Sequence, residues 1–409
     1  RLIERLIRNL PKEHRLLATT ATANNRVMDD LCDVLGPDLK VMRGSLARPS
    51  LFLQTISFEH MTERLAWLAD HIPTLTGCGI IYCLTIRDAL RITNWLNTRD
   101  IKAEAYSGKS EKRPELEQKL LNNELKVLVA TTALGMGFDK PDLAFVIHFQ
   151  TPGSVVAYYQ QVGRAGRALK YAYGILLSGK EENDINKYFI ESEFPKTSEV
   201  NQIIAILSEE PQGLSLPQLC NALNIRRNRI EKALQLMSLE SPAPIIKERS
   251  KWILTANDLN DSFWQRAERL TQLRQAEWQE MQEYVALEHG HMEFLIRALD
   301  GDAEGYEPPN IPPISESISE ASTQKATDFI NRSSFAIEPR RQWGVSKALP
   351  IYGFRGNIPR DDQTEEGRVL SVWGDPGWGK LVGSGKLNGR FNDDLVEAMA
   401  AMLFDWSPD

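Results

Sequence analysis

The sequence predicts an α/β fold in which a parallel sheet domain is followed by a winged-helix domain, a helical segment and a small mixed β domain. Between Ser57 and Pro195, apolar runs alternate with amphipathic helical stretches, as in a parallel sheet covered by helices on both faces. Between Val200 and Thr255, three short helical stretches precede two strand-like runs. That is the element order of a winged helix-turn-helix.

The first two segments carry the α/β pattern. The chain opens with a helix, the short apolar strand RLLATT and a second helix that starts near Asn24, which together make one βα unit without a sheet. The sheet domain follows, with strands predicted at 79–83, 102–106, 126–131, 143–149 and 173–177. We therefore expect six segments: 1–45 as a remnant of a first domain of this kind, 46–197 as the sheet domain, 198–256 as the winged helix, 257–300 as the helical segment, 301–330 as a linker and 331–409 as a small mixed α/β domain.

The later segments are assigned from composition. Residues 257–300 contain a strongly charged helix and a second, shorter one. The stretch PPNIPP and the Ser/Glu run after it contain no core material and predict a linker. The last segment combines many glycines and short β-type runs with a terminal helix. We therefore expect only a small independent core there.

Composition limits the classes of function. No stretch approaches the roughly 18 to 20 uninterrupted apolar residues of a membrane span, so we expect a cytoplasmic protein without membrane contact. The four cysteines are too few and too scattered for a disulfide framework, and none forms a C-x-x-C pair. With a net charge of −7, contact with nucleic acid must come from local basic patches.

One candidate site follows the strand KVLV, where the chain reads ATTALGMGFD. Thr131 and Thr132 put hydroxyls and amides at the carboxyl end of a strand, where they can bond a phosphodiester. Gly135 and Gly137 let the backbone pass close to a partner. Asp139 can accept a hydrogen bond from a ribose hydroxyl or from an arginine.

A second candidate site is the stretch YYQQVGRAGR, which we place on the helix after the strand LAFVIHF. Arg164 and Arg167 are three residues apart, so one helical face presents both guanidiniums to a phosphate. An arginine finger that stabilises a transferring phosphoryl group is worth roughly 10³ to 10⁵ in rate.

These two stretches resemble motifs V and VI of superfamily 2 helicases, in the wording of the RecQ-like family. LLATTATA at 16–23 resembles motif III, and GIIYC with the helix after it resembles motif IV. The resemblance covers about residues 10–180, with the four motifs in the family's order. It implies RecA-like motor domains and an ATP-driven 3′ to 5′ DNA helicase acting on single-stranded DNA and duplex junctions.

The resemblance also implies roles for individual residues. Thr20 and Thr22 would couple the nucleotide state to DNA, and Thr131 would touch the DNA backbone. Gly137 and Asp139 would contact the nucleotide. The ATP site would be completed by Gln160, Arg164 and Arg167 as catalytic residues.

The sequence departs from the family in its missing motor half. It contains no D-E-x-H segment, and the stretch GDPGWGK is followed by Leu381 instead of the Ser or Thr of a P-loop. We interpret GDPGWGK as a hairpin turn inside a glycine-broken β pattern. ATP and Mg²⁺ would then be held mainly by a missing N-terminal half, which agrees with a first residue, Arg1, that is not Met. We expect this chain alone not to hydrolyse ATP.

Two smaller departures concern side chains. Tyr106, Ser107 and Gly108 stand where RecQ-like proteins usually have Tyr-His-x-Gly. The cysteines of the family's zinc module are absent, and we interpret His289 and His291 as solvent-exposed histidines. We therefore expect neither zinc nor any other metal bound by these residues.

The winged-helix segment offers another contact with DNA. The stretch IRRNRIEKALQLMS begins with the basic residues Arg226, Arg227 and Arg229, which suit DNA phosphates. The alternative is a winged helix used for protein packing. Two further alternatives concern the whole chain: a motor-less DNA-binding adapter that uses the winged helix, and a superfamily 2 RNA helicase.

Overall fold

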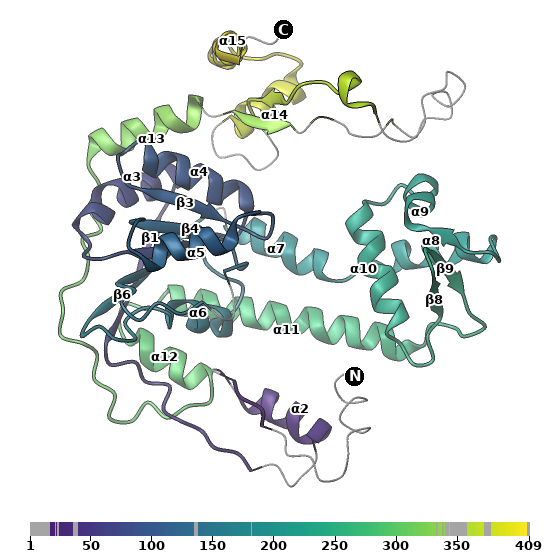
Figure 1. Cartoon of the computed structure of the whole chain (residues 1–409), viewed down its shortest axis with the longest axis horizontal. Coiled ribbons are helices and arrows are strands. Elements are labelled where there is room, and N and C mark those ends of the chain that lie inside the picture. The colour runs from purple at the N-terminus through teal and green to yellow at the C-terminus, as the bar shows by residue number, and fades with distance from the viewer. Residues whose placement is uncertain are drawn as a thin grey trace. The chain divides into compact units, whose positions relative to one another are not determined.

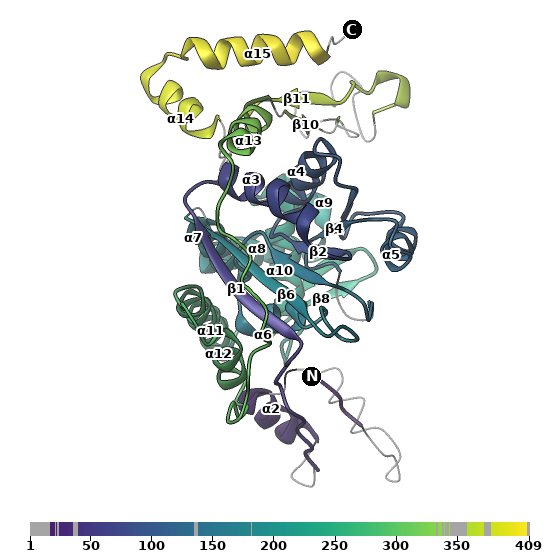
Figure 2. The same cartoon turned by 90° about the vertical axis from the view of Figure 1, so that its left-hand side faces the viewer.

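A computed structural model gives the fold of the chain (Figures 1 and 2). It describes residues 17–20, 22, 24–35, 40–134, 138–180, 182–332, 334–337, 339, 343, 358–371 and 378–406. The chain divides into two compact units, Arg1–Glu182 with Glu277–Thr327 and Asn183–Ala276 with Asp328–Asp409. Among the helices in these ranges, none is both long enough and apolar enough to cross a bilayer.

The first unit is built on a six-stranded sheet in the order β1-β6-β5-β2-β4-β3, with every neighbouring pair parallel. The five predicted strands are all present, which confirms the parallel sheet. A sixth, β1, was missed because Gln54 and Thr55 interrupt the apolar run of LFLQTISF. The strands are β1 Leu51–Phe58, β2 Gly79–Tyr82, β3 Ala103–Tyr106, β4 Val127–Ala130, β5 Phe145–His148 and β6 Ala172–Gly179.

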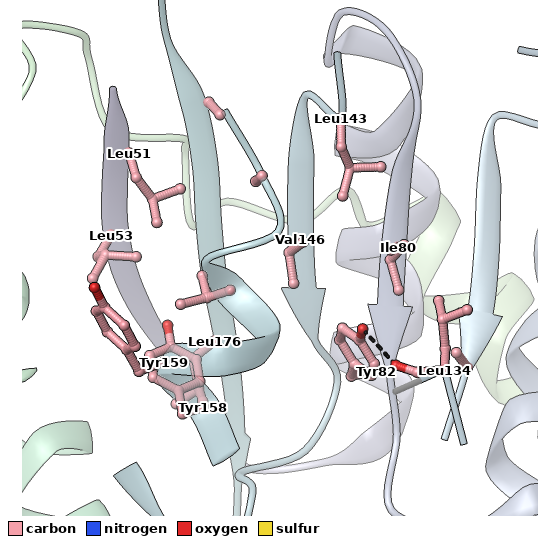
Figure 3. Close-up of a cluster of buried hydrophobic side chains, with 14 of the residues drawn as sticks. Leu51, Leu53, Ile80, Tyr82, Leu134, Leu143, Val146, Tyr158, Tyr159 and Leu176 are labelled. Atoms are coloured by element: carbon pink, nitrogen blue, oxygen red, sulfur yellow. Dashed lines mark hydrogen bonds between the residues drawn. The ribbon is translucent and has the colours of Figure 1, made fainter. Parts of the chain in front are cut away.

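Helices cover both faces of this sheet, as Figure 2 shows. Helices α3 (Met61–His71) and α4 (Ile86–Asn97) lie on one face, and the short 3₁₀ helix η1 (Ile72–Thr74) follows α3. Helices α6 (Val155–Val162) and α12 (His291–Ala298) lie on the other. Because successive strand residues point to opposite faces, Ile80, Tyr82 and Val146 share the core on the α6 side (Figure 3). Leu116 and Leu120 of α5 (Arg113–Leu121) join the same core.

The helical segment predicted at 257–300 is not a separate domain. Helix α11 (Asp261–Val285) enters the first unit with its C-terminal part, where Tyr284 is completely buried. The ring centroid of Tyr284 lies 5.0 Å from that of Tyr158 on α6, and the two hydroxyl oxygens are 3.2 Å apart. His291 packs edge-on against the same tyrosine at 5.2 Å. Residues 277–299 thus complete the sheet's hydrophobic core.

The prediction of a solvent-exposed His291 is wrong. The residue is only 9% exposed, and burial, aided by the nearby His289, lowers the pKa of its imidazole to about 4. Tyr284, which packs against His291, also packs against Phe294, so the histidine lies near aromatic rings. Because burial disfavours the charged form, the imidazole is neutral, and a neutral ring can lie in an apolar core.

Part of the predicted linker at 301–330 is bound to the sheet domain. The side-chain amide of Gln54 on β1 both donates to and accepts from the backbone of Ile314, at 2.9 Å each. The indole of Trp67 donates to the Ser315 carbonyl at 2.9 Å. Helix α13 (Glu320–Arg332) then begins inside the range assigned to the linker. Polar side chains of the domain hold this segment, and Ala303 and Tyr306 also pack against the core, which composition could not reveal.

The second unit contains the elements predicted for 198–256. Helices α8, α9 and α10 are followed by the hairpin β8–β9, and β7 completes a three-stranded antiparallel sheet in the order β7-β9-β8. Ile203, Leu219, Leu234 and Ile245 form its core with other apolar residues. The elements are α7 Glu182–Glu193, α8 Thr197–Ser208, β7 Leu214–Ser215, α9 Leu216–Ala222, α10 Arg227–Ser238, β8 Ile245–Glu248 and β9 Lys251–Leu254.

The C-terminal segment is more helical than predicted. It contains the antiparallel pair β10 (Phe335–Ile337) and β11 (Gly367–Val369), the short 3₁₀ helix η3 (Arg360–Asp362), and the helices α14 (Gly379–Asn388) and α15 (Asp393–Trp406).

The β pattern predicted at LVGSGKLNG is wrong, because residues 381–388 lie in α14. Its glycines do not break the helix: a Cβ at Gly385 would lie 2.7 Å from the ring of Phe391, so this glycine allows a close approach. Residues 372–377, and with them most of GDPGWGK, lie outside the described residues.

The packing of Tyr284 gives a test of the fold. We expect Tyr284→Ala to lower the free energy of unfolding by about 3 to 5 kcal/mol, because it empties a fully buried ring site between α6 and α12. Tyr284→Phe removes only the bond between the hydroxyls and should cost about 1 kcal/mol. Urea unfolding followed by circular dichroism measures both values. Equal midpoints for Tyr284→Ala and the unchanged chain would show that 277–299 is not part of the core.

Candidate nucleotide and nucleic-acid site

The two predicted arginines lie in a turn and not on a helix. Helix α6 ends at Val162, and residues 163–167, here called the arginine turn, connect it towards β6. Gly166 has a φ of +69° and donates its amide to the Leu143 carbonyl at 2.9 Å. A Cβ at this position would lie 2.9 Å from the Cβ of Ala172. Glycine is therefore required by both the backbone conformation and the close packing.

Two residues that the motifs did not include hold the arginine turn. Arg48 donates to the carbonyl oxygens of Gly163 and Ala165, at 2.7 and 2.9 Å. Ser50 donates to the carbonyl of Gly166 at 2.8 Å. Both precede β1, more than 110 residues away from the turn in sequence. No local pattern marks them, since their role depends on β1 pairing with β6.

The two arginines of the turn both contact the segment that follows motif V. Arg164 donates to the Phe138 carbonyl at 2.8 Å, and Arg167 forms an ion pair with Asp139 at 2.7 Å. Asp139 was predicted to accept a hydrogen bond from a ribose hydroxyl or from an arginine, and in the structure it accepts one from Arg167. The side chains of Arg167 and Asp139 are 42% and 60% exposed. An ion pair this exposed contributes about 1 kcal/mol or less, so a stronger anionic ligand can replace the carboxylate.

The electrostatic character of the turn is positive. Burial lowers the pKa of Arg48, and the nearby charge of Arg167 acts in the same direction. Arg48, Arg164 and Arg167 thus bring three guanidiniums to one turn, and the carboxylate of Asp139 pairs with Arg167. Clustered guanidiniums beside exposed backbone suit the recognition of phosphate groups.

The structure also brings together residues from motifs III and VI. The side-chain amide of Gln160 donates to the hydroxyl of Thr22 at 2.8 Å, and the Thr22 amide donates to the hydroxyl of Thr20 at 3.2 Å. Thr22 is only 4% exposed. Its hydroxyl therefore meets a protein group here, which suits the predicted coupling role better than direct contact with DNA.

Thr131 lies at the opposite edge of the sheet from the arginine turn. It follows the last residue of β4, whereas Gly166 bonds to Leu143 just before β5 begins, and all strands are parallel. The hydroxyl of Thr131 accepts from the Ala133 amide at 3.4 Å and is largely buried, while Thr132 is exposed. Gly135 and Gly137 lie outside the described residues.

A buried histidine supports the helix before the arginine turn. His148 ends β5, its Nε2 lies 2.8 Å from Oε1 of Gln161, and its ring stacks on Tyr82 at 5.3 Å. Burial lowers the pKa of His148 to about 4, against the smaller opposing effect of Gln161. The ring is therefore neutral at physiological pH.

The three arginines predicted to bind DNA in the second unit have different surroundings. Arg229 is bonded to Glu199 at 2.6 Å and to the carbonyls of Ser192 and Phe194, so its guanidinium is held by groups of the protein itself. Arg226 and Arg227 are exposed, and Arg227 pairs with Glu231 at 3.0 Å. Arg229 points back towards α8, which sequence spacing did not show.

No group of three or more His, Cys, Asp or Glu side chains in the described ranges could hold a metal ion.

Comparisons with known proteins place this site in a family context. Residues 63–169 match the family described as the helicase conserved C-terminal domain. The ATP-dependent DNA helicase RecQ of Bacillus subtilis is 32% identical over 195 residues, which cover 47% of this chain and 32% of the relative. The putative ATP-dependent RNA helicase R290 of Acanthamoeba polyphaga mimivirus is 33% identical over 181 residues, 43% of this chain and 32% of the relative.

The chain thus spans about a third of the length of these curated relatives. Among solved structures, Saccharomyces cerevisiae Dbp5 bound to RNA and ADP BeF3 is similar, with 20% identity and a TM-score of 0.40. That match covers 46% of this chain and 52% of the Dbp5 chain.

The buried histidine predicts a pH dependence of stability. The pKa of His148 is about 4 when folded and roughly 6.5 when unfolded, so the unfolded state binds more protons between these values. We expect the free energy of unfolding to fall as the pH is lowered from about 6.5 to about 4. Urea titrations at several pH values measure this fall, which should be smaller in His148→Phe.

The matched control is His60→Asn at an exposed position, which should leave the fall unchanged. His291 contributes in the same direction, so its variant His291→Phe should also reduce the fall. Identical pH profiles for His148→Phe and the unchanged chain would contradict the buried, neutral state of this histidine.

Proposed function

We propose that this chain is the second motor half of an ATP-dependent DNA helicase that moves 3′ to 5′. Residues 63–169 match the helicase conserved C-terminal domain, and the chain is similar to the DNA helicase RecQ of Bacillus subtilis. The observation that carries the proposal is the arginine turn, which brings together the guanidiniums of Arg48, Arg164 and Arg167, the last in an exposed ion pair with Asp139. The polarity rests on the resemblance to the family alone.

In the proposed mechanism Arg167 exchanges its partner. When ATP binds, Arg167 leaves the carboxylate of Asp139 for the phosphate oxygens, because a bidentate bond to phosphate is stronger than an exposed ion pair. Arg164 stays on the Phe138 carbonyl and fixes the segment before Asp139. Arg167 is then the catalytic residue and Arg164 a positioning residue, while Gln160 donates to the hydroxyl of Thr22.

The remaining wall of the ATP site belongs to a first motor domain. This sequence contains no P-loop that continues with Ser or Thr and no D-E-x-H segment. The described residues contain no group of three or more carboxylate, imidazole or thiol side chains that could hold Mg²⁺. We propose that ATP and Mg²⁺ are bound mainly by that first domain and that this chain alone is inactive.

Contact with DNA would come from two places. The exposed Thr132 and the turn capped by Thr131 lie at the carboxyl edge of the sheet and would contact the backbone of a single strand. The bond between Thr22 and Gln160 would couple the position of that strand to the nucleotide state. The unit with α8, α9, α10 and the β8–β9 hairpin would act as a winged helix on duplex DNA, through Arg226 and Arg227.

We place the protein in the cytoplasm.

An RNA helicase is the second candidate, because one relative is named as such. The two candidates differ in which nucleic acid accelerates ATP hydrolysis once a first motor domain is joined to this chain. We expect single-stranded DNA to stimulate hydrolysis more than RNA of the same sequence and length. Equal or greater stimulation by RNA would favour the RNA helicase.

The motor-less adapter differs from both helicases in its gene. The coding sequence upstream of Arg1 would encode neither a P-loop nor a D-E-x-H segment, and no first motor domain would restore hydrolysis. Such a result would leave only the DNA-binding part of the proposal.

The exchange mechanism predicts different effects for the two arginines. In a protein that joins this chain to its first motor domain, we expect Arg167→Ala to lower kcat for ATP hydrolysis by about 10³ or more with little change in stability. Arg164→Ala should lower kcat and also the melting temperature, because the Phe138 carbonyl loses its donor. A coupled ATPase assay and thermal unfolding measure the two effects.

Arg297→Ala, at an exposed position on α12, serves as the matched control and should change neither quantity. Full ATPase activity in Arg167→Ala would remove the arginine turn from the proposed ATP site.

A further inference from the structure

Two neighbouring aromatic rings are exposed on α7 in the second unit. Tyr188 is 55% exposed and Phe189 is 41% exposed, and their ring centroids lie 6.1 Å apart with an interplanar angle of 58°. Exposed rings of this size leave apolar surface in contact with water, which is unfavourable unless a ligand covers it. Neither residue belongs to any of the helicase motifs.

A structural arginine fixes these rings next to the basic end of α10. Arg229 on α10 donates to the carbonyls of Ser192 and Phe194, at 3.2 and 3.1 Å, and pairs with Glu199 on α8. These bonds tie the C-terminal end of α7 to the start of α10. The guanidinium Nη1 of Arg226 consequently lies 3.4 Å from the hydroxyl of Tyr188.

Both basic and acidic side chains lie near the rings. Lys187 precedes the aromatic pair and Lys196 follows α7, and both are exposed. Arg226 and Arg227 add two exposed guanidiniums, of which Arg227 is paired with Glu231. Exposed Glu191 is the acidic residue nearest in sequence to the rings. The exposed guanidinium of Arg226, next to the Tyr188 hydroxyl, can attract an anionic ligand to the rings.

We propose that Tyr188 and Phe189 form a stacking site for unpaired bases of single-stranded DNA, with Arg226 contacting the adjacent phosphate. Aromatic rings beside cations are the usual means of binding single strands without sequence preference, because every base has a face that can stack. The site deepens the proposed function, on which it rests: it holds a strand in the second unit, apart from the motif residues of the sheet domain.

The test is binding of a fluorescein-labelled poly(dT) oligonucleotide to the 409-residue chain, followed by fluorescence anisotropy. We expect Tyr188→Ala and Phe189→Ala each to weaken binding by about 5- to 150-fold, the loss of one stacked base. Tyr188→Trp should bind as tightly as the unchanged chain, because it keeps a ring. Phe404→Ala is the matched control at an 83% exposed ring on the acidic helix α15 and should have no effect.

Salt dependence separates stacking from charge. Arg226→Ala should reduce the slope of log Kd against log salt by about 0.7, the value for one phosphate contact on a single strand. Tyr188→Ala should weaken binding without changing this slope. Circular dichroism of each variant shows whether it is folded. If an alanine variant is not folded, Tyr188→Trp keeps the test valid.

Three outcomes would overturn the inference. If the unchanged chain binds poly(dT) and both alanine variants bind it equally well, the stacking site is wrong while DNA binding stands. If the variants weaken binding of poly(U) but not of poly(dT), the ligand is RNA. If the unchanged chain binds no single strand at all, both the stacking site and the proposed DNA contacts fail.

Discussion

The site depends on the left-handed backbone of Gly166. Because this residue has a positive φ and no side chain, the arginine turn can bend close to the start of β6. Arg48 and Ser50 then satisfy three of its carbonyls from the start of β1. Buried backbone groups need such partners, so the conformation of the turn is determined by the β1–β6 pairing and not by α6.

The hydrophobic core connects the arginine turn to other parts of the first unit. Tyr82 donates to the Leu134 carbonyl and lies near Arg164, whose charge opposes the burial that raises the pKa of Tyr82 to about 12. On its other side a chain of contacting rings runs from Tyr82 through His148 and Tyr158 to Tyr284. The C-terminal part of α11 and the whole of α12 therefore belong to the same cooperative structure as the arginines.

Local sequence patterns were sufficient for the sheet but not for the site's geometry. Five strands were predicted because each is a short apolar run such as VLVA, while β1 was missed because Gln54 and Thr55 interrupt it. The importance of Arg164, Arg167 and Asp139 followed from their motifs. Their contacts did not, since the end of α6 at Val162 depends on Gly163 and on donors from residue 48. The structural role of Arg229 likewise depends on Glu199, thirty residues away.

The central claim is that Arg167 leaves Asp139 for a phosphate when the nucleotide pocket is complete. A crystal structure of this chain joined to its first motor domain, with ADP and aluminium fluoride in place of the transferring phosphoryl group, tests it most directly. The account predicts the guanidinium of Arg167 within hydrogen-bonding distance of the fluoride, with the bond to Asp139 broken. An Arg167 still paired with Asp139 and pointing away from the nucleotide would contradict it.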